Sequence, residues 1–176
     1  MASLVPGIAC IGVIGKQNNP LHISLFPPGE RPSLEFSFML SSSLDIFEQR
    51  LPHKMADQDF GLLQAIDERL AMYGYLTNTG VKFVVIVDME GRPATVNDSK
   101  NPAAVGLRDS DVKPVFRALQ TAYVNLLRNP FYDPDEHMPS VAKAQNRVGS
   151  TQITSQKFIQ EVNRIGELWR PGITQL

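Results

Sequence analysis

The stretch MYGYLTNTGVKFVVIVD, residues 72–88, decides the fold class of this chain. Two runs rich in aromatic and β-branched residues flank Asn78-Thr79-Gly80, and a short glycine-containing loop between such runs is a hairpin signal. The second run, residues 81–88, is apolar almost throughout, as is typical of a central strand covered on both faces. The stretch therefore predicts an antiparallel hairpin inside a sheet.

Three more runs predict strands. The run IACIGVIG, residues 8–15, is rich in β-branched residues, and LHISLF, residues 21–26, alternates apolar and polar residues as a half-buried strand does. Asn18, Asn19 and Pro20 supply turn chemistry between them, so they predict a second hairpin. FGLLQAI, residues 60–66, is a short further strand.

Three helices are expected from apolar stripes at spacings of three and four. The first covers residues 34–51 with Ser33 as N-cap, and the second covers residues 111–127 with Asp111 as N-cap and Pro114 in the first turn. The third covers residues 155–170. Their stripes are Phe36, Leu40, Leu44, Phe47 and Leu51; Val112, Val115, Phe116, Leu119, Tyr123 and Leu126; and Phe158, Val162, Ile165 and Trp169.

The element order is therefore β-β-α-β-β-β-α-α, an α+β arrangement in which helices cover an antiparallel sheet. A length of 176 residues favours one domain, residues 1–176. Segments 27–33, 89–108 and 135–153 are rich in Gly, Pro and polar residues, and we expect extended or flexible loops there.

Composition disfavours several classes of protein. The formal net charge is −1, whereas coating nucleic acid requires clustered Lys and Arg to neutralise phosphates. Cys10 is the single cysteine, so neither an internal disulfide nor a Cys-rich zinc site can form. No apolar run approaches the ~20 residues that span a bilayer. We expect a soluble, cytoplasmic protein that reaches membranes through its partners.

The sequence GVIGK, residues 12–16, has part of a nucleotide-binding phosphate loop. That motif requires a glycine where Cys10 stands and a Ser or Thr where Gln17 stands. Small residues in a packed strand are the favoured interpretation, and an enzyme that binds nucleotide through Lys16 is the least favoured function.

No other grouping predicts catalysis, a cofactor or a metal site. His22, His53 and His137 lie in different elements without metal-ligand spacing, and we expect them at the surface or its rim. DPDEH, residues 133–137, lacks the Gly and the terminal Glu of a calcium loop and predicts a solvated acidic turn. Cys10 is expected to be a small buried hydrophobic residue.

The far side of the first helix predicts a partner-binding surface. Phe38, Ser42, Asp45 and Gln49 cluster opposite its apolar stripe. An aromatic residue on that side indicates either a partner surface or a side chain that packs under a neighbouring loop, and the two alternatives have equal weight.

The stretch NPFYDP, residues 129–134, follows the second helix and is the other candidate surface. Its first four residues match Asn-Pro-x-Tyr, a sorting signal on the tails of membrane proteins, yet no transmembrane segment is expected here. Its aromatic residues, Phe131 and Tyr132, could cap the end of the core or bind a partner.

Several segments, in order, resemble the sedlin-type subunits of the TRAPP complex, and the sedlin-like branch above all. They are IGVIGKQNNPLHI, SSSLDIFEQRL, MYGYLTNTGVKFVVIVD, GLRDSDVKPVFRALQTAYVNLLRNPFYDP and SQKFIQEVNRIG. The resemblance covers residues 8–134 and, more weakly, 155–169. Any one segment alone would be a weak signal, whereas their order is specific.

The resemblance implies a longin-like, or SNARE-like, fold: a five-stranded antiparallel sheet with one helix on one face and two on the other. It implies a non-catalytic adaptor of a TRAPP complex, which tethers vesicles and promotes nucleotide exchange on Rab GTPases. The TRAPPII form, in ER–Golgi or Golgi trafficking, is the form implied. The implied partners are small core subunits and large TRAPPII-specific subunits, with Asp45 as a contact, and NPFYDP is a structural segment of the family.

A longin-like module of another trafficking complex, either an adaptor small chain or a SNARE regulator, is the alternative function. The loops at 27–32, 89–106 and 135–153 look longer than in compact family members, so they are either additional contacts or flexible decoration. Another TRAPP branch carries a lipid-modified cysteine, and the resemblance does not extend that modification to Cys10.

Overall fold

The computed structural model describes residues 3–27, 29, 31–53, 58–96, 98, 107–138 and 152–176. Over these residues the predicted order of strands and helices is confirmed, with short 3-10 helices in addition. In chain order the elements are β1 (Leu4–Ile14), β2 (Pro20–Leu25), α1 (Ser33–Arg50), the 3-10 helix η1 (Leu51–His53), β3 (Asp59–Ala65), β4 (Leu70–Leu76), β5 (Lys82–Pro93), α2 (Asp109–Leu127), the 3-10 helix η3 (Pro134–His137) and α4 (Gln156–Leu168).

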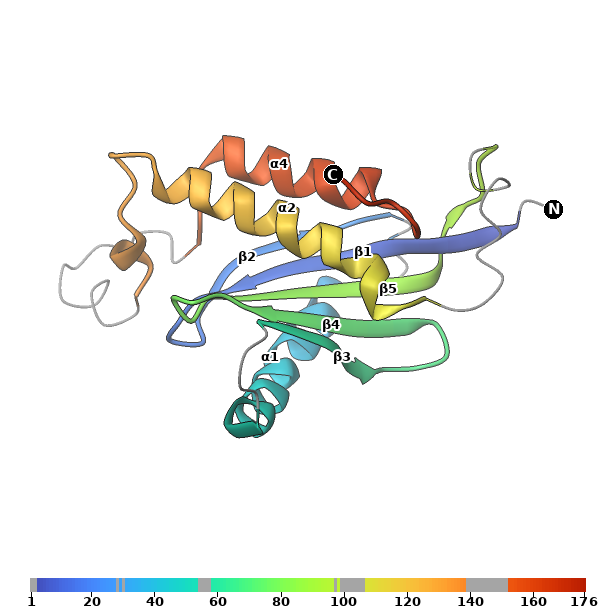
Figure 1. Cartoon of the computed structure of the whole chain (residues 1–176), viewed down its shortest axis with the longest axis horizontal. Helices are drawn as coiled ribbons and strands as arrows, with labels where there is room; N and C mark the ends of the chain where they lie inside the picture. The colour runs from blue at the N-terminus through green and yellow to red at the C-terminus, as the bar shows by residue number, and fades with distance from the viewer. Residues whose placement is uncertain are drawn as a thin grey trace.

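The strands form a five-stranded sheet in the order β2-β1-β5-β4-β3, and every neighbouring pair is antiparallel. Both predicted hairpins are present, and β5 is the central strand, as its apolar sequence predicts. Figure 1 shows α2 and α4 on one face of the sheet and α1 on the other. The predicted α+β, longin-like arrangement is therefore confirmed.

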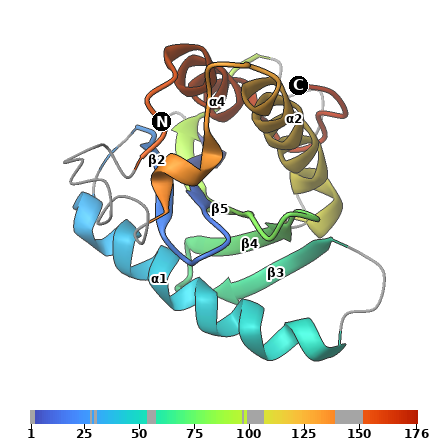
Figure 2. The ribbon, with the colours of Figure 1, turned by 90° about the vertical axis from the view of Figure 1, so that its left-hand side faces the viewer.

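Alternation along β5 divides the core into two layers. Phe83, Val85 and Val87 face α2 and α4, whereas Val84 and Ile86 face α1. Because successive residues of a strand point to opposite faces, one strand supplies both layers. Figure 2, turned by 90°, again shows the sheet between α1 on one side and α2 and α4 on the other.

A bulge in β1 interrupts this alternation. The pairing with β5 passes from Ile8↔Val87 directly to Cys10↔Ile86, so one extra residue is accommodated in β1. As a result Cys10 joins the α1 layer together with its neighbour Ala9, and Ile8 faces the α2–α4 layer.

The end of β5 differs from the prediction. β5 continues to Pro93, into the segment predicted as a loop at 89–108, because Leu4 and Val5 of β1 pair with Pro93 and Arg92. Residues 28, 30, 97, 99–106 and 139–151 of the three predicted loops, 27–33, 89–108 and 135–153, lie outside the described residues, and the flexibility of these loops stays a prediction.

Most of the predicted helix ends differ from the structure by one or two residues, whereas the end of α2 at Leu127 is as predicted. The N-cap of α1 is Pro32 instead of Ser33, and Leu51 follows the helix and is 43% exposed instead of packing with the stripe. α2 begins at Asp109, so Pro114 lies in its second turn. Asp111 is the third helical residue, and its carboxylate accepts the backbone N–H that precedes the helix at 2.9 Å, as in a capping box.

Candidate partner-binding surfaces

α1 lies close to the sheet because two strand glycines make room for it. Phe36, Leu40 and Phe47 of α1 are buried. A Cβ atom on Gly12 would lie 2.6 Å from Leu40 Cδ2, and one on Gly74 would lie 2.7 Å from Phe47 Cζ. Only glycine allows this approach, so Gly12 of the GVIGK stretch has a packing role.

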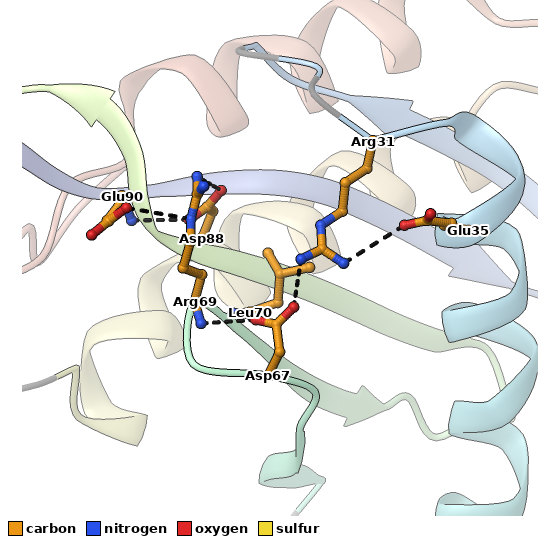
Figure 3. A network of polar contacts seen from close by, with 7 residues as sticks. All are labelled: Arg31, Glu35, Asp67, Arg69, Leu70, Asp88 and Glu90. Carbon is orange, nitrogen blue, oxygen red and sulfur yellow. Dashed lines mark hydrogen bonds and ion pairs between the residues drawn. The ribbon is translucent and has the colours of Figure 1, made fainter.

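Ion pairs fix the N-terminal end of α1 (Figure 3). The Arg31 guanidinium lies 3.6 Å from the Glu35 carboxylate and also pairs with Asp67 in the β3–β4 turn. Asp67 accepts the backbone N–H groups of Leu70 and Arg69 at 2.7 and 2.8 Å. These bonds, that of Leu70 first, and the Arg31 guanidinium lower the pKa of the Asp67 carboxyl, which favours the ionised form that holds Arg31.

The same network continues across the sheet. The Arg69 guanidinium lies 2.8 Å from the Asp88 carboxylate and 3.5 Å from that of Glu90, both on β5 (Figure 3). The turn that holds the start of α1 is therefore tied to the central strand.

Arg50 fixes the other end of α1. Its guanidinium donates to the backbone carbonyls of Phe60, Leu62 and Leu63 at 3.3, 2.7 and 3.0 Å. These carbonyls belong to β3, an edge strand, whose backbone acceptors are the kind of group that another strand could pair with. α1 is thus held at both ends while its outer side stays exposed.

The outer side of α1 carries the residues predicted for partner binding. Phe38, Ser42, Asp45 and Gln49 are all exposed. Phe38 is 66% exposed and Leu34 is 62% exposed, so no loop among the described residues buries the Phe38 side chain. Leu34 is not among the residues predicted for this surface, although its spacing of four from Phe38 places the two on one side of a helix.

The structure separates the two aromatic residues of NPFYDP. Phe131 is 94% exposed. Tyr132 is half-buried against the α2–α4 layer, and its ring centroid lies 5.5 Å from that of His137. Burial raises the pKa of the Tyr132 phenol. Tyr132 therefore caps the core, whereas Phe131 is available to a partner.

A pocket of about 190 Å³ lies beside Lys16, between the β1–β2 turn, the β4–β5 turn and η3. Lys16 Nζ is 3.8 Å from the Asp135 carboxylate. A carboxylate beside the cation repels a phosphate group, so the pocket does not support the phosphate-loop interpretation. Cys10 is fully buried in the core as predicted, and burial raises the pKa of its thiol to about 12, which keeps it unreactive.

The prediction of surface histidines is wrong for two of the three. His22 and His137 are 8% and 6% exposed. His22 lies on β2 under α4, with its Nε2 2.7 Å from Ser24 Oγ and its ring edge-on to Phe158. The side chain of His53 lies outside the described residues.

The DPDEH stretch forms η3, and its predicted acidic turn is confirmed. Asp133 caps η3 by accepting the backbone N–H of Asp135 at 2.9 Å. Across the parts of the chain that the structure describes, no three His, Cys, Asp or Glu residues gather closely enough to bind a metal ion. Over the same parts, no helix has the length and apolar character needed to cross a bilayer.

Comparison with known proteins identifies the family. The sedlin family model matches residues 13–167. The trafficking protein particle complex subunit 2-like protein of Mus musculus is 34% identical over 152 residues, which is 83% of this chain and 94% of the relative. That of Dictyostelium discoideum is 32% identical over 166 residues, 90% of this chain and 95% of the relative. As the ordered sequence segments predict, the chain belongs to the sedlin family.

Proposed function

We propose that this chain is a non-catalytic adaptor subunit of a TRAPP vesicle-tethering complex that promotes nucleotide exchange on a Rab GTPase. The observation that carries the proposal is the sedlin match over residues 13–167, together with relatives named as subunits of the trafficking protein particle complex. The TRAPPII form, at the cytoplasmic side of Golgi or ER–Golgi membranes, is the finer part of the proposal. Its partners are then small core subunits and large TRAPPII-specific subunits.

The outer side of α1 supports an adaptor role. Leu34 and Phe38 expose large apolar side chains near its N-terminus, and Asp45 and Glu48 are exposed toward its C-terminus. Exposed aromatic residues on a rigid element are typical anchors of protein interfaces. This surface suits a subunit that offers an apolar pocket and, about two helical turns away, a cationic side chain for Asp45.

Affinity purification of the tagged full-length chain from its own cells, followed by mass spectrometry, tests the proposal. We expect the wild type to bring down TRAPP core and TRAPPII-specific subunits. Phe38→Asp and Asp45→Tyr should each lose a neighbouring subunit while circular dichroism stays unchanged. Gln160→Asp, which adds a charge on the exposed side of α4, is the matched control and should retain every subunit.

Each outcome separates the parts of the proposal. If core subunits co-purify without TRAPPII-specific ones, only the TRAPPII assignment is refuted. TRAPP subunits retained by Phe38→Asp and Asp45→Tyr would refute the α1 surface but keep the complex. If the wild type brings down coat adaptors or SNARE proteins and no TRAPP subunit, the complex itself is wrong.

The non-catalytic role has its own test. The purified chain alone should not accelerate nucleotide release from any Rab, because its contribution is to hold other subunits. Robust exchange by the isolated chain would overturn this part.

A further inference from the structure

The turn after α2 carries a second exposed aromatic side chain, remote from the outer side of α1. Phe131 is 94% exposed and follows α2, which covers the face of the sheet opposite to α1 (Figure 1). One partner bound along α1 would therefore leave this turn accessible to another.

The backbone around Phe131 is held in one conformation. The Phe131 N–H donates to Asn129 Oδ1 and the Tyr132 N–H to the Asn129 carbonyl, both at 3.1 Å. Tyr132 packs inward on His137, whose carbonyl accepts from Asn19 Nδ2 at 2.9 Å. Because a Phe side chain has two rotatable angles and its backbone is already fixed, binding through it costs little conformational entropy.

Acidic residues follow this aromatic residue in the same turn. Among the described residues, Asp133, Asp135 and Glu136 are exposed there, and Arg128, at the end of α2, is an exposed cation. Asp135 also lies 3.8 Å from Lys16, but the two side chains are 62% and 54% exposed, so that pair is weak. Among the described residues of this region, three exposed carboxylates therefore stand against two exposed cations, Arg128 and Lys16, and the net charge is negative.

The negative charge favours some classes of binding partner over others. An anionic membrane would be repelled by the carboxylates. A second copy bound symmetrically would place the same carboxylates opposite one another, which is unfavourable. A protein surface that combines an apolar pocket with flanking Lys or Arg side chains satisfies both the aromatic residue and the charge.

We infer that Phe131, Asp133 and Asp135, hereafter the Phe131 surface, form a second docking site for a protein with an apolar pocket flanked by cationic side chains. The chain then bridges two proteins, one along α1 and one at the Phe131 surface. The bridging rests on the proposed function, which supplies the α1 partner, whereas the Phe131 surface stands on its own geometry.

Site-specific crosslinking identifies the partner. A photoreactive phenylalanine analogue replaces Phe131 in the full-length chain in its own cells, and mass spectrometry maps the crosslinked residues. We expect crosslinks to a protein segment with apolar residues flanked by Lys or Arg, on a protein different from the one lost by Phe38→Asp. Crosslinks confined to lipid or to another copy of this chain would overturn the inference.

Binding measurements with the purified partner then test each residue. Phe131→Ala should weaken binding about 30-fold or more, as for a central interface anchor. Asp133→Asn should weaken it a few-fold and reduce its salt dependence, because asparagine keeps the cap of η3 and removes the charge. Leu168→Ala, which trims an apolar residue that is 50% exposed on α4, is the matched control and should bind normally, as should Phe38→Asp.

The result for Phe131→Ala is decisive because this side chain contributes little to the fold. The thermal unfolding temperature of Phe131→Ala should match that of the wild type, and unchanged partner binding by this variant would then refute the inference. If TRAPP subunits co-purify but Phe131→Ala has no effect, the inference fails and the proposed function stands. If the crosslinked partner is confirmed while no TRAPP subunit co-purifies, the Phe131 surface stands and the proposed function fails.

Discussion

Gly166 of α4 lies directly against the Phe26 ring, and this contact decides the effect of substituting it. A Cβ atom at Gly166 would lie 2.1 Å from Phe26 Cζ and 2.3 Å from Cε1. At an exposed position inside a helix, replacing glycine by alanine stabilises the folded state by about 1 kcal/mol. Overpacking a buried contact instead destabilises the folded state by about 1–3 kcal/mol or more. We expect Gly166→Ala to lower the free energy of unfolding by about 1–2 kcal/mol, measured by urea denaturation.

A second substitution shows whether the ring is the cause. Phe26→Leu gives the new methyl group space, so the double variant Phe26→Leu/Gly166→Ala should be more stable than the sum of the two single effects predicts. Strict additivity would contradict this account of Gly166.

His22 makes stability depend on pH. Burial lowers the pKa of its imidazole from the ordinary value of 6.5. Just below pH 6.5 the unfolded chain therefore binds a proton that the folded chain does not. With respect to His22, the free energy of unfolding is highest well above pH 6.5, and it decreases as the pH falls from 6.5 through the lower pKa of the folded state. Urea midpoints between pH 8 and pH 5.5 measure it.

The matched variant His22→Gln separates this residue from other titrating groups. Glutamine can still donate to Ser24 Oγ, which lies 2.7 Å from His22 Nε2, but it does not titrate. The decrease in stability between pH 8 and pH 5.5 should therefore be smaller in His22→Gln. Parallel wild-type and variant curves would exclude His22 as the source.

At the scale of elements, Arg50 connects the end of α1 to the edge of the sheet. One guanidinium donates to three carbonyls of β3, and a charged donor contributes about 1.5–3 kcal/mol per bond when buried, less when solvent competes. We expect Arg50→Ala to destabilise by about 1–3 kcal/mol and to increase amide exchange in β3. Arg50→Lys should be intermediate, because an ammonium group cannot span three acceptors.

Opening this edge has a second consequence. Carbonyls of β3 released from Arg50 can pair with another chain, so Arg50→Ala should self-associate in size-exclusion chromatography. Arg117→Ala, which removes the same charge from an exposed position of α2, should stay at the wild-type elution volume. A monomeric Arg50→Ala variant with unchanged exchange in β3 would show that the guanidinium does not protect the edge.

Local patterns predicted most elements because their causes are local. The Asn78-Thr79-Gly80 loop specifies the β4–β5 hairpin, with Gly80 at φ 86°, a left-handed conformation that glycine readily adopts. The extension of β5 to Pro93 has no local cause, since it depends on pairing with Leu4, which is distant in the sequence. No periodicity in residues 89–93 could have predicted it.

The features of the candidate surfaces were likewise predictable where their cause is local and not where it depends on residues from another element. Helical spacing predicted that Phe38 and Asp45 share a side of α1, and both are exposed. The opposite placement of Phe131 and Tyr132 was not predictable, because it depends on the ring of His137 in η3. For the same reason the burial of His22 required knowledge of which helix covers β2.

At the scale of the whole molecule, the two layers share one sheet and should unfold together. Alternate residues of β5, such as Val84 and Val85, belong to the α1 layer and the α2–α4 layer respectively. Neither layer retains its packing surface if β5 leaves the sheet. A defect in one layer should therefore destabilise the other equally.

Trp169 and Phe47 test this coupling from opposite sides of the sheet. Trp169, the single tryptophan, is 1% exposed in the α2–α4 layer, and its Nε1 donates to the Asp111 carbonyl at 2.9 Å. Phe47 is fully buried in the α1 layer.

Phe47→Leu should lower the free energy of unfolding by about 1–2 kcal/mol. It should lower the urea midpoints of Trp169 fluorescence and of far-UV circular dichroism by the same amount. Phe38→Ser, at an exposed position of the same helix, should move neither midpoint. If Phe47→Leu moved the dichroism midpoint and left that of Trp169 in place, the α1 layer would unfold independently, and the sheet would not be the rigid connection that a bridge between two partners requires.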